Sequence, residues 1–198
     1  YLLAGPSQGG GTSSDSAGAT SSTSHDGSSS YQIMSCVFRF VCSNGLIAGD
    51  MFNNIRVRHT GNVVGDVIEG ATRVLEDAKQ IGYRIDEYKG IMLGQDEQQA
   101  FAKAALQLRW GDDAPINTNR LLAAHRHADV KGDLWTTFNR VQENMMKGGV
   151  PGRSATGRRI TTRAVGGVTE NVKLNKALWT LADTMAALKL DKSTDQFI

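Results

Sequence analysis

The chain has 198 residues, of which 40% are hydrophobic and 21% charged, proportions typical of a globular protein with one domain or two small ones. Lys and Arg outnumber Asp and Glu by 22 to 20, so the net charge of +2 selects no class of partner, and a charge-driven function must depend on local clustering. There is no run of eighteen or more apolar residues, so the sequence predicts no membrane span and no membrane partner.

The first part of the chain is rich in small polar residues: residues 5–30 contain ten Ser and six Gly. Such a stretch buries too little surface to offset the entropy of ordering it, so we predict a flexible lead-in over residues 1–30. It lacks the basic start and apolar middle of a signal peptide. Cys36 and Cys42 lie too far apart on an extended strand to bridge each other, which favours a reducing compartment. We therefore predict a cytoplasmic location.

Two strands are predicted after the lead-in. Residues 31–42 alternate, with two Cys and two Phe on one side of the strand and Val, Arg and Val on the other. The tripeptide Ser43-Asn44-Gly45 supplies turn residues, and a second strand is expected over residues 54–59.

Helical periodicity dominates from residue 61 onward. Apolar residues recur every three or four positions over residues 61–82, and a shorter helix is expected over 85–92. We predict three capped helices, which begin at Asp96, Thr118 and Asp133, and expect Gly148 and Gly149 to end the third. A last helix is predicted over residues 174–188, followed by a polar tail over 191–198. The aromatic side chains on or beside these apolar stripes are expected in the core: Trp135, Phe138 and Trp179.

A β-hairpin is predicted between the last two helices. Residues 158–165 alternate and are β-branched, Gly166-Gly167 is a two-residue turn signal, and residues 168–173 return as the partner strand. With the strands at 31–42 and 54–59 this gives an α+β fold, a small antiparallel sheet packed against several helices. We expect one domain over residues 31–190.

The strongest functional signal is a cluster of cations around this predicted hairpin. Residues 147–176 contain seven Lys or Arg and one acidic residue, Glu170. Cations at this density can neutralise successive phosphates of a nucleic acid. We predict nucleic-acid binding, single-stranded DNA favoured, through six residues: Arg153, Arg158, Arg159, Arg163, Lys173 and Lys176. Two alternatives stay open, a solvated edge hairpin protected by its charge and a surface for an acidic protein.

Other polar clusters carry weaker signals. The tripeptide His125-Arg126-His127 follows a helical pattern, in which residues two apart diverge, so a solvated basic turn is expected there. An alternative hydrolytic or nuclease-like site would draw on five residues near the first strands: His25, Asp26, Cys42, Asn44 and His59. Phosphate-binding glycine loops of the common nucleotide-binding kinds are absent. We assign no catalytic residue, metal or cofactor.

Several segments together resemble a known family: SHDGSSSYQIM (24–34), FRFVCSNGL (38–46), VRHTG (57–61), LWTTFNRVQENMMKGG (134–149) and VKLNKALWTLADTMAALK (172–189). The sequence is similar to domain of unknown function 932, the UPF0380-type prophage proteins carried by phages and plasmids. The resemblance implies a mobile-element, cytoplasmic setting and carries over no activity or catalytic residue. Because the family continues with ordered sequence upstream of residue 24, where this chain has its Ser/Gly tract, we expect a truncated member.

These observations predict a non-enzymatic, DNA-associated accessory protein that binds the phosphate backbone, with single-strand binding or annealing as one form of that role. The hydrolytic enzyme is the first alternative. The second is a protein-interaction module, such as an inhibitor of host defence. The sequence leaves the oligomeric state open and is compatible with a homo-oligomer.

Overall fold

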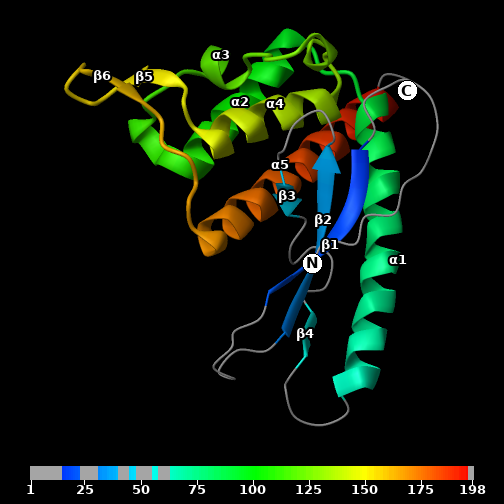
Figure 1. The fold of residues 1–198 in the computed structure, drawn as a ribbon. Helices are drawn as coiled ribbons and strands as arrows, with labels where there is room; N and C mark the ends of the chain where they lie inside the picture. The colour runs from blue at the N-terminus through cyan, green and yellow to red at the C-terminus, as the bar shows by residue number, and fades with distance from the viewer. Residues whose placement is uncertain (1–14, 23–30, 40–44, 48–54, 58–62, 196–198) are drawn as a thin grey trace. The chain divides into compact units, whose positions relative to one another are not determined.

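A computed structural model describes residues 15–22, 31–39, 45–47, 55–57 and 63–195. The chain groups into two compact units, residues 1–84 and 85–198, and each is described by itself. Figure 1 traces the order of the helices and strands along the chain.

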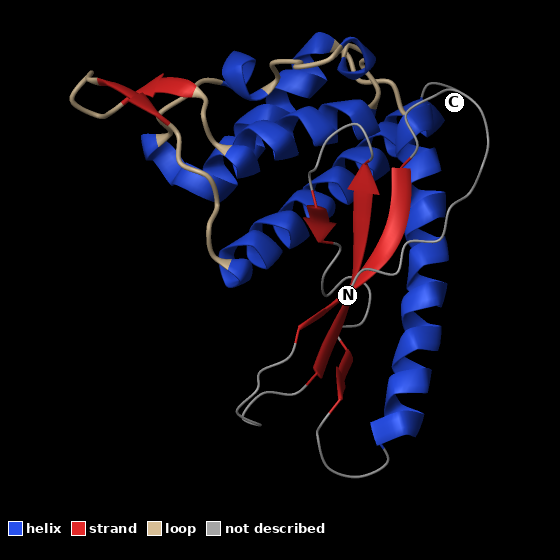
Figure 2. Ribbon diagram, viewed as in Figure 1, coloured by secondary structure: helices blue, strands red, loops and turns tan. Residues whose placement is uncertain are grey.

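The first unit contains a four-stranded antiparallel sheet built around strand β2 (Tyr31–Arg39). Strand β1 (Asp15–Ser22) pairs with β2 over its whole length, from Asp15 opposite Arg39 to Ser22 opposite Gln32. Strands β3 (Gly45–Ile47) and β4 (Ile55–Val57) pair with the two ends of β2. Figure 2 shows these strands in red. The strands predicted at 31–42 and 54–59 are thus found at 31–39 and 55–57, and their remaining residues lie outside the described ranges.

Strand β1 lies within the segment that the sequence predicts as a flexible lead-in. Its residues, DSAGATSS, have little apolar surface, but a sheet ladder is held by backbone N–H and C=O groups that every non-proline residue carries. A composition that argues against a hydrophobic core therefore does not argue against an edge strand. The predicted division of the chain into a lead-in to residue 30, a domain over 31–190 and a tail over 191–198 stays a prediction.

Helix α1 (Val63–Gly90) is continuous, whereas the sequence predicts two helices with an end near Gly82. A glycine inside a helix costs about 1 kcal/mol relative to alanine. Ile81, Ile85 and Tyr88 recur at helical spacing around Gly82 and are all buried, which offsets that cost. Among the helices that the structure describes, none has both the length and the apolar character to cross a membrane.

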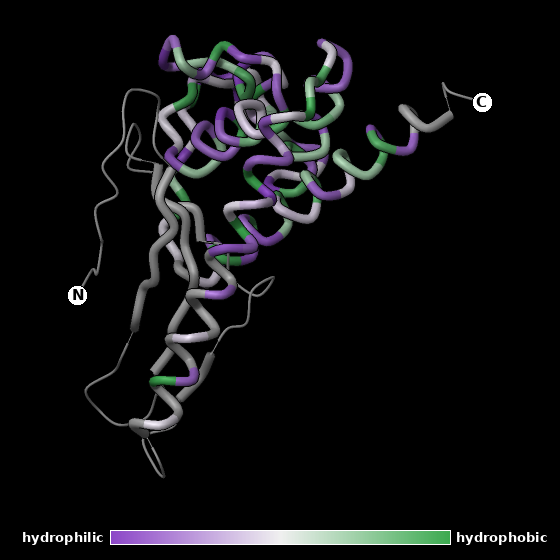
Figure 3. The backbone as a smooth tube through the Cα atoms, turned by 90° about the vertical axis from the view of Figure 1, so that its right-hand side faces the viewer, coloured by the Kyte–Doolittle hydropathy of each residue, from purple (hydrophilic) through white to green (hydrophobic). Residues whose placement is uncertain are grey.

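The second unit is mostly helical. Helices α2 (Gln95–Trp110), α4 (Leu134–Lys147) and α5 (Val168–Asp195) pack against one another. Figure 3, coloured by hydropathy, shows hydrophobic and hydrophilic residues interspersed along the helical part of the chain. The rings of Trp135, Phe138 and Trp179 are at most 2% exposed, and that of Phe138 lies 5.6 Å from Trp135 and 5.1 Å from Trp179, centroid to centroid. The prediction that these three aromatics form the core is confirmed.

The starts of these helices agree in part with the predicted caps. Asp133 caps α4 as predicted, because its Oδ1 accepts a hydrogen bond from the backbone N–H of Thr136 at 2.8 Å. Helix α2 instead begins after Gly94, whose N–H donates to Oε2 of Glu97 at 2.7 Å, so the predicted cap at Asp96 is wrong. The short helix α3 (Thr118–Leu121) is capped by Asn117 and not by Thr118. The unit also contains two single-turn 3₁₀ helices, η1 (Gly111–Asp113) and η2 (His127–Asp129).

A second, two-stranded antiparallel sheet joins β5 (Pro151–Arg153) and β6 (Arg159–Thr161). The predicted strand 158–165 is therefore present in shortened form. The predicted partner strand 168–173 is wrong, since these residues form the start of α5, where the N–H of Asn171 donates to the carbonyl of Gly167 at 2.9 Å. Glu170 favours the helix because a negative charge in the first turn interacts well with the helix dipole. The α+β class itself is confirmed.

Candidate functional site

The β5–β6 hairpin and its flanks, residues 150–163, are called the arginine hairpin here. Figures 1 and 2 show it projecting from the helices of its own unit. One side of its base is closed by Thr162: the N–H of Thr162 donates to the carbonyl of Val150, and the N–H of Gly149 donates to the carbonyl of Thr162, both at 2.9 Å. The Oγ1 of Thr162 also accepts from the N–H of Val150 at 3.1 Å. Because Thr162 is only 7% exposed, these bonds are shielded from water.

Two glycines allow the hairpin to sit close against the rest of the unit. A Cβ added to Gly152 would lie 2.2 Å from the carbonyl oxygen of Pro115, and the N–H of Arg153 donates to that oxygen at 2.8 Å. A Cβ added to Gly148 would lie 2.5 Å from the backbone of Arg163 and of Ala164. Gly148 also has a positive φ of 67°, which glycine adopts without strain. The two ends of the hairpin are therefore fixed by main-chain contacts that leave no room for a side chain.

Four exposed arginines belong to the arginine hairpin. Arg153 and Arg159 face each other across the strands, so their side chains share one face of the ribbon. Arg158 lies at the end of the turn, and Arg163 follows β6. Within residues 63–195, none of these guanidinium groups forms an ion pair with a carboxylate. Their charges are therefore available to an anionic partner.

An aromatic side chain from α2 lies near this cluster. Arg109 donates from Nη2 to the carbonyl of Arg163 at 2.5 Å, and its Cζ lies 4.5 Å from the ring centroid of Trp110. Burial lowers the pKa of Arg109, and the nearby carboxylate of Glu170 acts in the opposite direction. The group still remains charged, as arginine does throughout the physiological range. Sequence reasoning missed Trp110, because it lies forty residues before the start of the hairpin at residue 150 and no local pattern connects the two.

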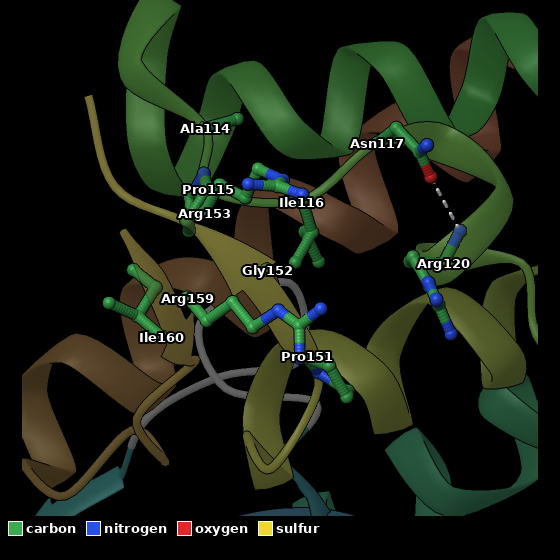
Figure 4. Close-up of a pocket in the computed structure, with 10 residues that line it drawn as sticks. All are labelled: Ala114, Pro115, Ile116, Asn117, Arg120, Pro151, Gly152, Arg153, Arg159 and Ile160. Atoms are coloured by element: carbon green, nitrogen blue, oxygen red, sulfur yellow. Dashed lines mark hydrogen bonds between the residues drawn. The ribbon is translucent and has the colours of Figure 1, made fainter. Parts of the chain in front are cut away.

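An open pocket of about 640 Å³ lies between the hairpin and the loop that leads into α3. Figure 4 shows Arg120 from α3 and Arg159 from β6 among its lining residues, with the hydrogen bond from the N–H of Arg120 to Asn117. Ten residues line it: Ala114, Pro115, Ile116, Asn117, Arg120, Pro151, Gly152, Arg153, Arg159 and Ile160. Three of these ten are arginines and none is acidic, so the pocket is positively charged.

The six residues predicted to bind nucleic acid fall into two groups. Arg153, Arg158, Arg159 and Arg163 belong to the arginine hairpin. Lys173 and Lys176 lie on α5 and not on a return strand. Arg120 was not predicted. The residues of the alternative hydrolytic site, His25, Asp26, Cys42, Asn44 and His59, lie outside the described ranges. Among the residues that the structure describes, no group of three His, Cys, Asp or Glu side chains could hold a metal ion.

The segment predicted as a solvated basic turn contains a partly buried ion-pair network. Arg126 donates to Oδ2 of Asp129 at 2.8 Å and to Oε1 of Glu143 at 2.5 Å, and Lys147 donates to the same Glu143 oxygen at 2.9 Å. Asp129 and Glu143 are 2% and 6% exposed. The prediction is therefore wrong for Arg126, while His125 and His127 are exposed as expected. The spacing of Glu143 and Lys147, four residues apart on a helix, was a signal for part of this network.

Burial would raise the pKa of Glu143, but the hydrogen bonds and charges of Arg126 and Lys147 more than offset it and leave the pKa lowered. A group whose pKa is lower in the folded than in the unfolded protein stabilises the fold above its unfolded pKa, about 4.3 for Glu, and loses that contribution as the pH falls through the folded value. We expect Glu143→Gln to flatten the loss of stability between neutral and acidic pH. Urea unfolding of both proteins at a series of pH values measures this, and parallel curves would contradict it.

Comparison with known proteins identifies a family and indicates no activity. A sequence model described as "Domain of unknown function (DUF932)" matches residues 16–179. The chain is 48% identical over 163 residues to UPF0380 protein YfjQ and 47% identical over 163 residues to UPF0380 protein YafZ, both of Escherichia coli strain K12. Each match covers 82% of this chain and 60% of the relative, so the chain spans about three fifths of the length of these relatives. No solved structure matches it.

Proposed function

This chain belongs to the family described as Domain of unknown function (DUF932), and we propose that it is a non-enzymatic accessory protein that binds the phosphate backbone of single-stranded DNA through its arginine hairpin. The observation that carries the proposal is the set of four exposed arginines on one short hairpin, free of ion pairs within residues 63–195. Each guanidinium that neutralises a phosphate releases counterions, which is the main source of sequence-independent affinity.

The way the hairpin is held favours binding. Its base is fixed by the bonds of Thr162 and by close packing at Gly148, and strand β5 is fixed by the bond from Arg153 to Pro115 and by close packing at Gly152. Side chains on a fixed ribbon lose less conformational freedom on binding than side chains on a flexible loop. Arg153 and Arg159 share one face of the ribbon in the strand pair next to the turn, Arg158 lies beside them at the end of the turn, and Arg163 extends the charge toward the base.

A single strand is favoured over a duplex by the apolar groups among the cations. Ile160 is 36% exposed and lines the same pocket as Arg153 and Arg159, and Trp110 is partly exposed. Unpaired bases can pack on such groups, whereas bases in a duplex are stacked on one another and hidden. Lys173 and Lys176 lie on α5, outside the hairpin, and we propose that they contribute only to the periphery of the interface. The setting we propose is a cytoplasmic protein of a mobile element.

The experiment is a fluorescence-anisotropy titration of a labelled oligothymidine and of a labelled duplex at salt concentrations from about 50 to 200 mM. We expect binding to the single strand that weakens steeply with salt. In Arg158→Ala/Arg159→Ala the affinity at low salt should fall about tenfold, and the slope of log K against log salt should become shallower by about 1.4, or 0.7 for each lost contact.

The matched control is Lys103→Ala/Lys131→Ala, which removes two exposed positive charges that neither belong to the hairpin nor line the pocket. It should bind with an affinity within about twofold of the unchanged protein. Equal losses in the two double variants would show that net charge and not the hairpin determines binding. Absence of binding to either nucleic acid at low salt would remove the proposal and leave the acidic-protein alternative.

A further inference from the structure

The pocket beside the arginine hairpin is built from two segments distant in the sequence. Residues 114–120 form one wall and residues 151–160 the other, joined by the bond from the N–H of Arg153 to the carbonyl of Pro115. Its volume of about 640 Å³ is that of a site for a small molecule or for one unit of a polymer.

The chemistry of the walls selects an anion with an apolar part. Arg120, Arg153 and Arg159 reach the pocket from α3, β5 and β6, and the forked guanidinium group matches two oxygens of a phosphate at once. Arg153 uses one N–H on the carbonyl of Gly157, at 3.0 Å, and a guanidinium has five such donors. Pro115, Ile116, Pro151 and Ile160 supply apolar surface beside the cations.

The number of cations distinguishes between two kinds of phosphate. A phosphodiester inside a strand carries one negative charge, whereas a terminal phosphate monoester carries between one and a half and two at neutral pH, roughly, and has three free oxygens. Three arginines without an acidic neighbour in the lining match the monoester better. The geometry points to a pocket for the terminal phosphate monoester of a nucleic-acid strand, with the sugar or base of the last nucleotide against the apolar walls. This inference rests on the proposed function, because the hairpin is what brings the strand to the pocket.

The test compares one labelled oligothymidine in three forms, with a 5′-phosphate, with a 3′-phosphate and with hydroxyl groups at both ends. We expect the protein to bind one phosphorylated form about tenfold more tightly than the hydroxyl form. In Arg120→Ala this ratio should fall to about one, and in Arg120→Glu below one. Arg120 is exposed and makes its bond to Asn117 through the backbone, so both variants keep the cap of α3. Arg158→Ala, outside the pocket, should weaken all three forms to the same degree and keep the ratio.

The outcomes separate the two proposals. Equal affinity for all three forms would overturn the pocket assignment and leave the hairpin proposal standing. No binding of any form would overturn both. Competition by free thymidine 5′-monophosphate identifies the source of the monoester: we expect it to displace the phosphorylated strand only weakly. Tight binding of the free nucleotide without any preference for phosphorylated strands would overturn the assignment to a strand end.

Discussion

Replacement of Arg126 by methionine is expected to lower the free energy of unfolding at neutral pH by about 3–5 kcal/mol. The side chain bridges two carboxylates, with Nη1 at 2.8 Å from Asp129 and Nη2 at 2.5 Å from Glu143, and both carboxylates are almost fully buried. Methionine keeps the apolar stem of the side chain and removes its charge. The loss therefore measures the cost of removing the cation that the two buried carboxylates share, while Glu143 keeps its ion pair with Lys147. Urea unfolding monitored by tryptophan fluorescence gives the value.

A rescue experiment distinguishes this electrostatic cost from a general packing defect. Adding Glu143→Gln to Arg126→Met removes one of the two charges and should recover part of the lost stability. Arg158→Ala, which removes an exposed arginine with no ion pair in residues 63–195, should change stability by less than about 0.5 kcal/mol. A loss below about 1 kcal/mol in Arg126→Met would mean that the network contributes little, as exposed salt bridges do.

Gly152→Ala is the second change with a large expected effect, about 3 kcal/mol of lost stability together with loss of strand binding. The added Cβ would meet the carbonyl oxygen of Pro115 at 2.2 Å and Cγ2 of Ile116 at 2.8 Å. The first contact is with backbone, which cannot move away as the end of a flexible side chain can. The loop at 115–116 and strand β5 must therefore separate, which breaks the bond from Arg153 to Pro115 and opens the pocket.

The control for this variant is Gly166→Ala. No atom lies within 4 Å of the position of its added Cβ, and its φ lies outside the range that disfavours side chains. This change should leave both stability and binding near those of the unchanged protein, and it can add a few tenths of a kcal/mol through the unfolded chain. Thermal unfolding and the anisotropy titration measure the two properties. If Gly152→Ala and Gly166→Ala have the same stability and the same affinity, the close packing of the hairpin on the 115–116 loop does not stabilise the protein.

The sequence predicts those parts of the fold that depend on residues close together in the chain. The stripe that contains Phe138 and the N-cap at Asp133 were both predictable, since helical spacing and capping chemistry act within a few residues. The strand β1 was not, because its pairing with β2 depends on backbone groups and leaves no mark on composition. The end predicted at Gly82 failed for a related reason: burial of Ile81 and Ile85 outweighs the modest cost of one glycine.

The candidate site was likewise predicted only in part. The cluster of arginines was visible in the sequence, and Arg153, Arg158 and Arg159 do share one hairpin. The partner strand was misassigned, which moved Lys173 to α5. The pocket was beyond prediction, because it joins Arg120 to a strand about thirty residues later and only the tertiary fold brings the two segments together. Arg126 was expected in solvent because a charged residue type usually lies there, and burial with two partners is the exception.

The manner in which the arginine hairpin is attached has a consequence for how this surface can vary. The hairpin is held to the rest of its unit through its strands and flanks: the N–H of Arg153 donates to the carbonyl of Pro115, Arg109 donates to the carbonyl of Arg163, and the N–H of Gly149 donates to the carbonyl of Thr162. The turn closes on itself, with Ser154 bonded to Arg158 and Gly157 bonded to Ser154. Ala155, Thr156 and Arg158 can therefore be exchanged while these bonds remain, whereas Gly157, with its φ of 79°, favours glycine. The tip of the hairpin can therefore change in sequence while the helices that support the hairpin stay the same.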